Sequence, residues 1–260
     1  MLPITLMPVS STAHQSNIWH PSTGATFQWQ LSDKPVDRTV EASVYDIDLF
    51  ENDARVVSAL HHSGRHVICY VDVGSYEDWH PDKARFLAQH AVIGKPYAGW
   101  QGEWWLDIRR LDILGPIMRS RLDLCKSKGF DAVEPDNIDG YTNDTGFPLH
   151  YQDQLRFNRW LADEAHQRRL SIGLKNDGDQ ASDLLQHFDW ALTEDCFNQG
   201  WCDQIGPFIQ AGKAVFAVEY DDATSLRTFD QRYCPQARRV HLTLIFKHRG
   251  LDRWRRTCAR

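Results

Sequence analysis

The chain has 260 residues, of which 42% are hydrophobic and 12% aromatic, enough to bury one large core. Its 35 acidic and 29 basic side chains give a formal net charge of −6, and Arg253-Trp254-Arg255-Arg256 is the one run rich in arginine, which argues against a nucleic-acid partner. No apolar stretch approaches the roughly 18 residues that cross a bilayer, so we expect no membrane span.

Residues 1–25 are predicted to be a leader or flexible N-terminal segment, ahead of a catalytic domain at 26–260. The part Met1–Gln15 is mildly apolar but has no Lys or Arg before its apolar residues. As it stands this is a poor secretory signal, and it is left out of the predicted fold.

Eight short runs rich in Val, Ile and aromatic residues recur along the chain, with helical patterns between them. They span 27–31, 44–48, 67–71, 132–136, 171–175, 190–194, 215–219 and 240–245. This alternation predicts an α/β fold, specifically a single (β/α)₈ TIM barrel, which commonly needs about 250 residues.

Helices are predicted at 52–63, ending at Gly64, and at 116–128, ending at Gly129, because glycine commonly terminates helices. A third helix, 151–168, carries four apolar residues at helical spacing that should pack against the barrel: Leu155, Trp160, Leu161 and Ala165.

The gap between the third and fourth predicted strands is too long for a simple loop and helix. Residues 74–105 hold six aromatic residues, namely Tyr76, Trp79, Tyr97, Trp100, Trp104 and Trp105. Barrels often enlarge such loops at the catalytic face, so we expect an elaborated loop region there.

The cysteines suggest an exported protein. Cys196 with Cys202, and Cys234 with Cys258, are disulfide candidates, whereas Cys69 and Cys125 lie in apolar patterns and are expected to be buried thiols. The expected location is extracellular or in the cell envelope. Reduced thiols in a cytoplasmic enzyme remain the alternative.

Polar residues gather where the predicted strands end, which is the active-site face of this fold. They are Asp46, Asp48, Tyr70, Asp72, Asp136, Asn137, Asp139, Lys175, Asn176, Glu194, Glu219 and Tyr220. Burying so much negative charge requires a bound cation, a cationic substrate or shared protons. Separated carboxyl pKa values would then suit acid/base chemistry.

Paired acids and many tryptophans indicate sugar hydrolysis, in which one carboxyl protonates the leaving oxygen and another attacks or activates water. Six tryptophans at predicted loops or strand ends could stack on sugars, although some should be core: Trp29, Trp79, Trp100, Trp104, Trp105 and Trp201. The histidines His61, His62 and His66 fall on the opposite face of the barrel, so we expect neither a metal site nor a cofactor.

The motifs, taken in order, resemble glycoside hydrolase family 114, the endo-α-1,4-polygalactosaminidases. The resemblance covers the chain from about residue 27 onward. The matching stretches are Trp29 to Ser32, Val44 to Asp48, Val67 to Tyr70 with Gly74-Ser75, Glu103 to Ile108, Gly129 to Asp131, Glu134 to Tyr141, Gly173 to Asn176, Glu194 with Cys196 and Cys202, and Val218 to Tyr220.

This resemblance implies a TIM barrel that cuts α-1,4-linked galactosamine polymers internally. The acidic cleft suits such a cationic polysaccharide. It places the catalytic pair at Asp136, as nucleophile, and Glu194, as acid/base, with the assignment within the pair left open. Trp104 and Asp107 join the strand-end residues as expected substrate contacts, and Glu134 should tune the site from deeper in the barrel.

Two residues depart from the family pattern, Asp195 and Asp72, and either could alter the charge near the sugar. Lys175 could keep the nucleophile ionised or neutralise the acidic ring, and a Schiff-base role is the alternative.

We expect a monomer and a retaining mechanism. The alternatives are a non-catalytic carbohydrate-binding barrel, or a glycosidase of the same fold acting on another α-linked polysaccharide.

Overall fold

The computed structural model describes residues 18–258, so residues 1–17 of the predicted leader lie outside the described part. The remaining leader residues touch the barrel, because the Trp19 ring stacks on His66 with the ring centroids 4.2 Å apart. Within residues 18–258, no helix combines the length and apolar character needed to cross a membrane.

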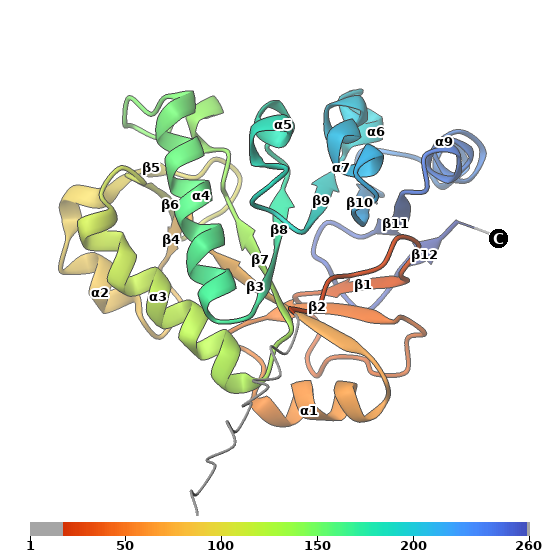
Figure 1. The fold of residues 1–260 in the computed structure, drawn as a ribbon, viewed down its shortest axis with the longest axis horizontal. Helices are drawn as coiled ribbons and strands as arrows, with labels where there is room; N and C mark the ends of the chain where they lie inside the picture. The colour runs from red at the N-terminus through yellow and green to blue at the C-terminus, as the bar shows by residue number, and fades with distance from the viewer. Residues whose placement is uncertain (1–17, 259–260) are drawn as a thin grey trace, which may run out of the picture.

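Eight parallel strands form a curved sheet with the order β1-β2-β3-β7-β8-β9-β10-β11 (Figure 1). Their bounds are Phe27–Gln30, Val44–Asp48, His66–Asp72, Ala132–Asp136, Ser171–Lys175, Trp190–Glu194, Val215–Tyr220 and Thr243–Lys247. This confirms the α/β barrel class. The predicted start of the last strand, Val240, was wrong because that residue caps the preceding helix α9 (Cys234–Arg239).

The C-terminal segment closes the seam of the barrel. Among the described residues no strand ladder joins β1 to β11. Instead the backbone N–H groups of Leu31 and Ser32 donate to the Leu251 carbonyl at 2.9 Å and 3.2 Å. A short strand, β12 (Arg256–Thr257), then pairs antiparallel with β11.

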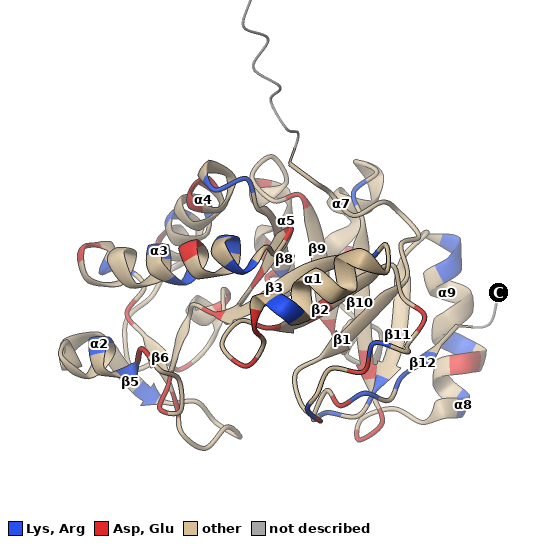
Figure 2. Ribbon diagram, turned by 90° about the horizontal axis from the view of Figure 1, so that it is seen from below, with Lys and Arg blue, Asp and Glu red and all other residues tan. Residues whose placement is uncertain are grey.

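Helices cover the outside of the sheet, and the long ones are α1 (Ala54–His62), α3 (Leu111–Lys128) and α4 (Tyr151–Gln167). All three predicted helices are present, but α3 begins five residues before Pro116, which it carries inside. The shorter helices are α5 (Ala181–Leu184), α6 (Cys196–Gln199), α7 (Gly206–Gln210), α8 (Leu226–Thr228) and α9. Both acidic and basic residues lie along α3, as Figure 2 shows.

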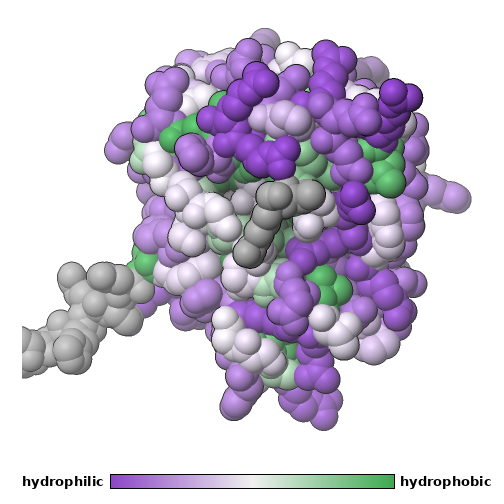
Figure 3. Space-filling model, turned by 90° about the vertical axis from the view of Figure 1, so that its right-hand side faces the viewer, coloured by the Kyte–Doolittle hydropathy of each residue, from purple (hydrophilic) through white to green (hydrophobic). Residues whose placement is uncertain are grey.

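Two apolar layers hold the barrel. Side chains at alternate strand positions, such as Phe27, Ile68 and Trp190, fill its interior, and a second layer packs between sheet and helices. The interior is tight, because a Cβ at Gly173 would lie 2.4 Å from the Trp190 ring. The outer surface is mostly hydrophilic with small apolar patches on the side shown in Figure 3.

The expected elaboration between the third and fourth barrel strands is a small domain-like insertion. It contains β4 (Ser75–Glu77), α2 (Lys83–Leu87), β5 (Ile93–Pro96) and β6 (Glu103–Leu106). The three strands form an antiparallel sheet with the order β4-β6-β5, which lies beside the carboxyl ends of the barrel strands.

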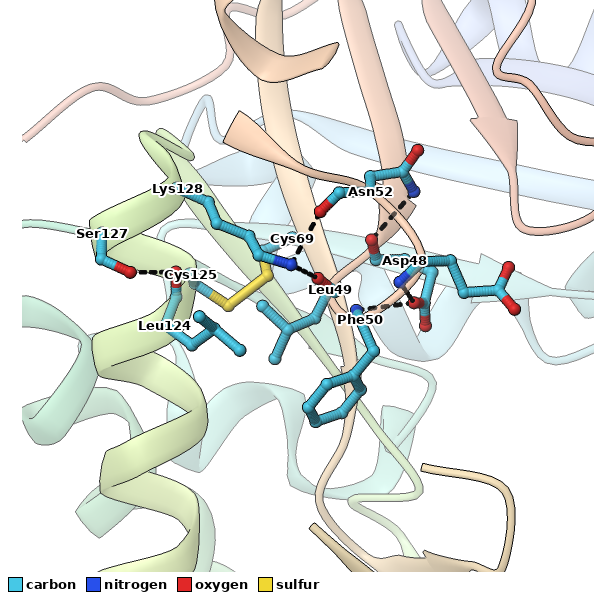
Figure 4. The surroundings of a disulfide bond; sticks show 10 residues. Asp48, Leu49, Phe50, Asn52, Cys69, Leu124, Cys125, Ser127 and Lys128 are labelled. Atoms are coloured by element: carbon cyan, nitrogen blue, oxygen red, sulfur yellow. Dashed lines mark hydrogen bonds between the residues drawn. A yellow bond between two sulfur atoms is a disulfide. The ribbon is translucent and has the colours of Figure 1, made fainter. Parts of the chain in front are cut away.

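Three disulfides are present within residues 18–258. Cys196–Cys202 and Cys234–Cys258 agree with the predicted pairs. The prediction of free thiols at Cys69 and Cys125 was wrong, because these residues form the third disulfide, between β3 and α3 (Figure 4). Their 56-residue separation in sequence concealed a contact that only the packing of helix on strand creates.

Of the three disulfides, we expect the one between Cys69 and Cys125 to stabilise the fold most. Replacing both cysteines by alanine should lower the free energy of unfolding by about 2–4 kcal/mol, because the bond closes the longest loop of the three. The same change at Cys196 and Cys202, six residues apart, should cost about 2 kcal/mol less. Urea unfolding of both variants measures the difference, and equal losses would contradict this ranking.

Candidate active site

A cavity of about 960 Å³ opens at the carboxyl ends of the parallel strands. Nine predicted site residues line it: Asp48, Tyr70, Asp136, Asn137, Asp139, Lys175, Asn176, Glu194 and Tyr220. Five do not line it: Asp46, Asp72, Trp104, Asp107 and Glu219. The structure therefore brings the two predicted catalytic carboxylates together and separates part of the predicted acidic ring from the cavity.

The ammonium group of Lys175 is the centre of the site. Its Nζ lies 3.0 Å from Glu134 Oε1, 2.8 Å from Asp136 Oδ1 and 3.2 Å from Glu194 Oε2. It also sits over the Trp29 ring, 4.7 Å from the centroid. Burial disfavours the charged amine, but the three carboxylates outweigh it and hold the pKa of Lys175 well above its ordinary value. Lys175 is thus a permanent cation.

Each carboxylate of the pair also accepts a hydrogen bond from a tyrosine that lines the cavity. Tyr70 donates to Asp136 Oδ2 at 2.8 Å, and Tyr220 donates to Glu194 Oε1. Burial, followed by the nearby carboxylate charges, raises the pKa of both phenols well above the ordinary value, so they remain protonated donors. Asn176 adds a third contact to Glu194, with its Nδ2 3.3 Å from Oε2.

Asp136 is held in its ionised form. Burial raises its pKa, but the Lys175 charge and the hydrogen bonds from Lys175, Tyr70 and the backbone N–H of Asn137 together bring the pKa below its ordinary value. Asn137 adopts a left-handed backbone with φ of 59°, which turns its N–H towards Asp136. The ordinary cost of burying a carboxylate is therefore offset by contacts made to the charged form.

Beneath the pair, Asp46 and Glu134 form a carboxyl pair. Burial and the charge of Glu134 raise the pKa of Asp46 well above its ordinary value, so Asp46 carries the proton and donates to Glu134. Burial raises the pKa of Glu134 to about 7 despite the Lys175 charge. The expected deeper position of Glu134 is confirmed, since it is fully buried below Asp136 on β7.

A second polar network joins the insertion to the barrel. Asn137 Nδ2 lies 2.8 Å from Asp72 Oδ2 and 3.0 Å from Glu103 Oε1, and the Ser75 hydroxyl contacts the same two carboxyl groups. Burial and the Asp72 charge raise the pKa of Glu103 to about 10, so Glu103 is the protonated partner. Asp72, predicted as a substrate contact, instead anchors this network.

The other residues outside the cavity have structural contacts that follow from strand geometry. Glu219 faces outward on β10, where its two oxygens accept from the backbone N–H groups of Phe197 at 2.8 Å and Asn198 at 3.1 Å. Asp107 forms a bidentate pair with Arg109. On β6, Glu103 lines the cavity, so its neighbour Trp104 lies on the other face, 5.6 Å from the Tyr76 ring.

Several cavity residues were not predicted from the sequence, and Asp177 and Arg249 are the charged ones with the strongest contacts to the predicted site. Asp177 accepts from Asn158 Nδ2 at 2.9 Å, and burial followed by the Asp139 charge raises its pKa to about 8. Arg249 stacks over the Tyr220 ring at 3.8 Å and pairs with Asp195 at 2.8 Å. The unusual charge at Asp195 is therefore neutralised. Asp177 could have been found from its position directly after Lys175-Asn176 at a predicted strand end. Arg249 lies in the C-terminal segment that closes the seam of the barrel, a role that the sequence pattern did not indicate.

The histidine cluster lies away from the cavity. His61 Nε2 and His66 Nδ1 lie 2.9 Å and 3.3 Å from the same Asp131 oxygen. Between residues 18 and 258 no group of three or more His, Cys, Asp or Glu residues is arranged to hold a metal ion.

Comparisons with known proteins agree with this arrangement. The model of the glycoside-hydrolase family GH114 matches residues 9–260. The crystal structure of Aspergillus fumigatus Ega3 in complex with galactosamine is 36% identical, with a TM-score of 0.87, covering 95% of this chain and 100% of that one. The glycoside hydrolase domain of PelA from Pseudomonas aeruginosa shares the fold at 11% identity and a TM-score of 0.70, covering 90% and 99%. No curated protein gives a match.

We expect the buried, protonated carboxyls to make the protein less stable as the pH rises. Burial and neighbouring carboxylates raise the pKa of Glu77 to about 9 and of Glu103 to about 10. The stability that these two protonated carboxyls contribute is fully present below their pKa in the unfolded chain, about 4.5. It is lost as the pH rises through their pKa in the folded chain. The melting temperature should therefore fall between pH 5 and pH 8.

The variant Glu103→Gln should flatten this slope, because the amide stays neutral and keeps both a donor and an acceptor. Asp163→Asn, on an exposed position of α4, is the matched control and should leave the slope unchanged. Thermal scans at constant ionic strength provide the measurement. A melting temperature that rises from pH 5 to pH 8, or a slope that Glu103→Gln leaves intact, would contradict the protonated network.

Proposed function

This chain belongs to glycoside-hydrolase family GH114, and on that premise we propose that it cleaves galactosamine-containing polysaccharide internally. The observation that carries the proposal is the pair Asp136 and Glu194, which share one buried ammonium, that of Lys175, at the bottom of the cavity. Glycoside hydrolysis requires two carboxyl groups on opposite sides of the bond that is cleaved, and this pair can supply them.

The geometry of the pair supports retention of configuration. Because Asp136 Oδ1 and Glu194 Oε2 bond the same nitrogen at 2.8 Å and 3.2 Å, the two oxygens lie at most about 6.0 Å apart, the sum of those distances. Retaining enzymes place their carboxyl groups about 5–5.5 Å apart, and inverting enzymes about 6.5–9.5 Å. The upper bound therefore favours direct attack by one carboxylate over activation of a water between them.

The roles within the pair follow from their surroundings. Asp136, kept ionised by Lys175 and Tyr70, is the proposed nucleophile. Glu194 is the proposed acid/base, because it is the other carboxyl group of the pair that lines the cavity, on the strand next to Lys175, whereas Glu134 is fully buried beneath them.

Two displacements complete the proposed reaction. In the first, the protonated Glu194 gives its proton to the glycosidic oxygen as that oxygen leaves C1, and an Asp136 oxygen bonds to C1. In the second, a water molecule gives a proton to Glu194 while the water oxygen bonds to C1, and the bond between C1 and Asp136 breaks. Both carboxyl groups return to their starting states.

The substrate class is proposed from charge. The Ega3 structure holds galactosamine, whose amine is cationic near neutral pH when it is not acetylated. Asp139 lines the cavity beside the pair, where burial followed by the Asp136 charge raises its pKa to about 6, and no side-chain donor pairs with it among the described residues. A substrate ammonium would provide that partner and favour the ionised carboxylate.

Three disulfides among the described residues suit an oxidising compartment, so we propose an exported protein. The division into a leader at 1–25 and a catalytic domain at 26–260, and the monomeric state, remain predictions from the sequence.

The variants Asp136→Asn and Glu194→Gln should each lower turnover of an α-1,4-linked galactosamine polymer by about a thousandfold or more, because each removes a group that reacts. Asp163→Asn should match the parent protein. Polymer cleavage is measured by mass spectrometry of the released oligosaccharides, and NMR of the first product reports the anomeric configuration, with α expected for retention. A β product would refute the nucleophile role.

The same experiment separates the alternatives. Binding of the polymer by the parent protein without any release of product would favour a non-catalytic carbohydrate-binding barrel. Products from a fully N-acetylated polymer, and none from the deacetylated one, would favour a glycosidase for another α-linked polysaccharide.

Asp139→Asn should reduce kcat/KM for the deacetylated polymer by about tenfold, because a charge-assisted contact to the amine becomes a neutral one. On a partly acetylated polymer the variant should lose less kcat/KM, and the loss should become smaller as the acetyl content rises. An equal loss on both polymers would show that Asp139 does not read the amine.

A further inference from the structure

The insertion carries two tryptophans that face the same cavity as the catalytic pair. Trp79 and Trp100 are each 50% exposed, whereas Trp29 and Trp105 are 1% and 3% exposed. Both exposed residues line the cavity. Large aromatic surface left in water at the rim of a ligand cavity indicates a ring-binding function more than a packing one.

These two residues are fixed in place by the loops that carry them. Trp79 packs on Gly102, where a Cβ would lie 2.9 Å from the Trp79 ring, so only glycine allows this approach. The backbone N–H of Asp78 donates to the Gly102 carbonyl at 3.0 Å and ties the two loops together. Trp100 lies in the turn between β5 and β6, where its N–H donates to the Tyr97 carbonyl at 3.1 Å.

The loops connect rigidly to the catalytic centre. The Tyr97 ring packs against the Trp105 ring at an interplanar angle of 59°, with centroids 4.5 Å apart, and the backbone N–H of Tyr97 donates to the Glu103 carbonyl at 2.8 Å. Glu103 in turn contacts Asn137, the neighbour of Asp136. The tryptophans therefore stand on the same framework as the nucleophile but contact neither catalytic carboxylate.

We propose that Trp79 and Trp100 form a remote subsite, which stacks on sugar units of a long amino-sugar chain away from the bond that is cleaved. This inference rests on the proposed function and adds where the rest of the polymer is held. The apolar C–H face of a pyranose packs on an indole, and a protonated amine over the ring gains a cation–π contact. Acidic residues elsewhere on the cavity wall, including Asp48 and Glu51, favour the same cationic chain.

A subsite of this kind acts only on chains long enough to reach it. In the double variant Trp79→Ala/Trp100→Ala, kcat/KM for the polymer should fall about tenfold, mainly through KM. For the shortest oligosaccharide that the enzyme cleaves, kcat/KM should change by less than about twofold. Phenylalanine at both positions should restore most of the loss, because it keeps an aromatic face.

Trp254→Ala is the matched control, since Trp254 is also exposed, at 38%, but does not line the cavity. It should leave the rates on both substrates unchanged. Equal losses on long and short substrates in the double variant, or no loss on the polymer, would overturn the remote subsite.

A binding measurement keeps this test separate from the proposed function. Calorimetry with the galactosamine polymer and the Asp136→Asn protein requires no turnover, and adding the two tryptophan changes should weaken binding about tenfold. If the parent enzyme fails to cleave the polymer, the proposed function fails, yet this binding difference still supports or refutes the subsite. Unchanged affinity would refute it.

Discussion

The site depends on one buried cation shared among three carboxylates. An ammonium without partners would be costly inside the barrel, and so would any of the carboxylates. Lys175 contacts Glu134, Asp136 and Glu194 together, so the burial of each group is tolerated because the others are present. The same contacts fix the separation of Asp136 and Glu194, the two proposed catalytic carboxyls, and so link the stability of the barrel to the geometry of the site.

The barrel register is what delivers these groups to one point. Glu134 and Asp136 lie two residues apart on β7, Lys175 ends β8 and Glu194 ends β9, so all four project inward near the carboxyl ends of adjacent strands. The apolar interior below them, with Trp190 packed against Gly173, excludes water from the lower barrel. Low local polarity then strengthens each charge contact above it.

Periodicity and strand ends were sufficient to predict the barrel, and also that residues such as Asp136, Lys175 and Glu194 gather at the carboxyl ends of its strands, because these features repeat locally along the chain. Pairings between distant segments were not predictable in the same way. Cys69 and Cys125 each fit an apolar pattern, and only the packing of α3 on β3 brings them together. The antiparallel strands of the insertion were missed as strands because their short, aromatic-rich segments show no clear period. Without them, nothing indicated that Trp104, expected as a substrate contact, would face Tyr76 and not the cavity.

Position at a strand end is also a weaker guide to ligand contact than the face of the strand. Glu219 and Tyr220 are adjacent at the end of β10, yet Tyr220 contacts Glu194 in the cavity while Glu219 accepts two backbone N–H groups of α6 on the outside. Successive residues on a strand point to opposite sides, so half of any acidic run at such an edge serves the outer layer. Acids on the inner face remain short of cations, with Lys175 as their main counter-charge, and a polycationic chain is the kind of ligand whose binding relieves that imbalance.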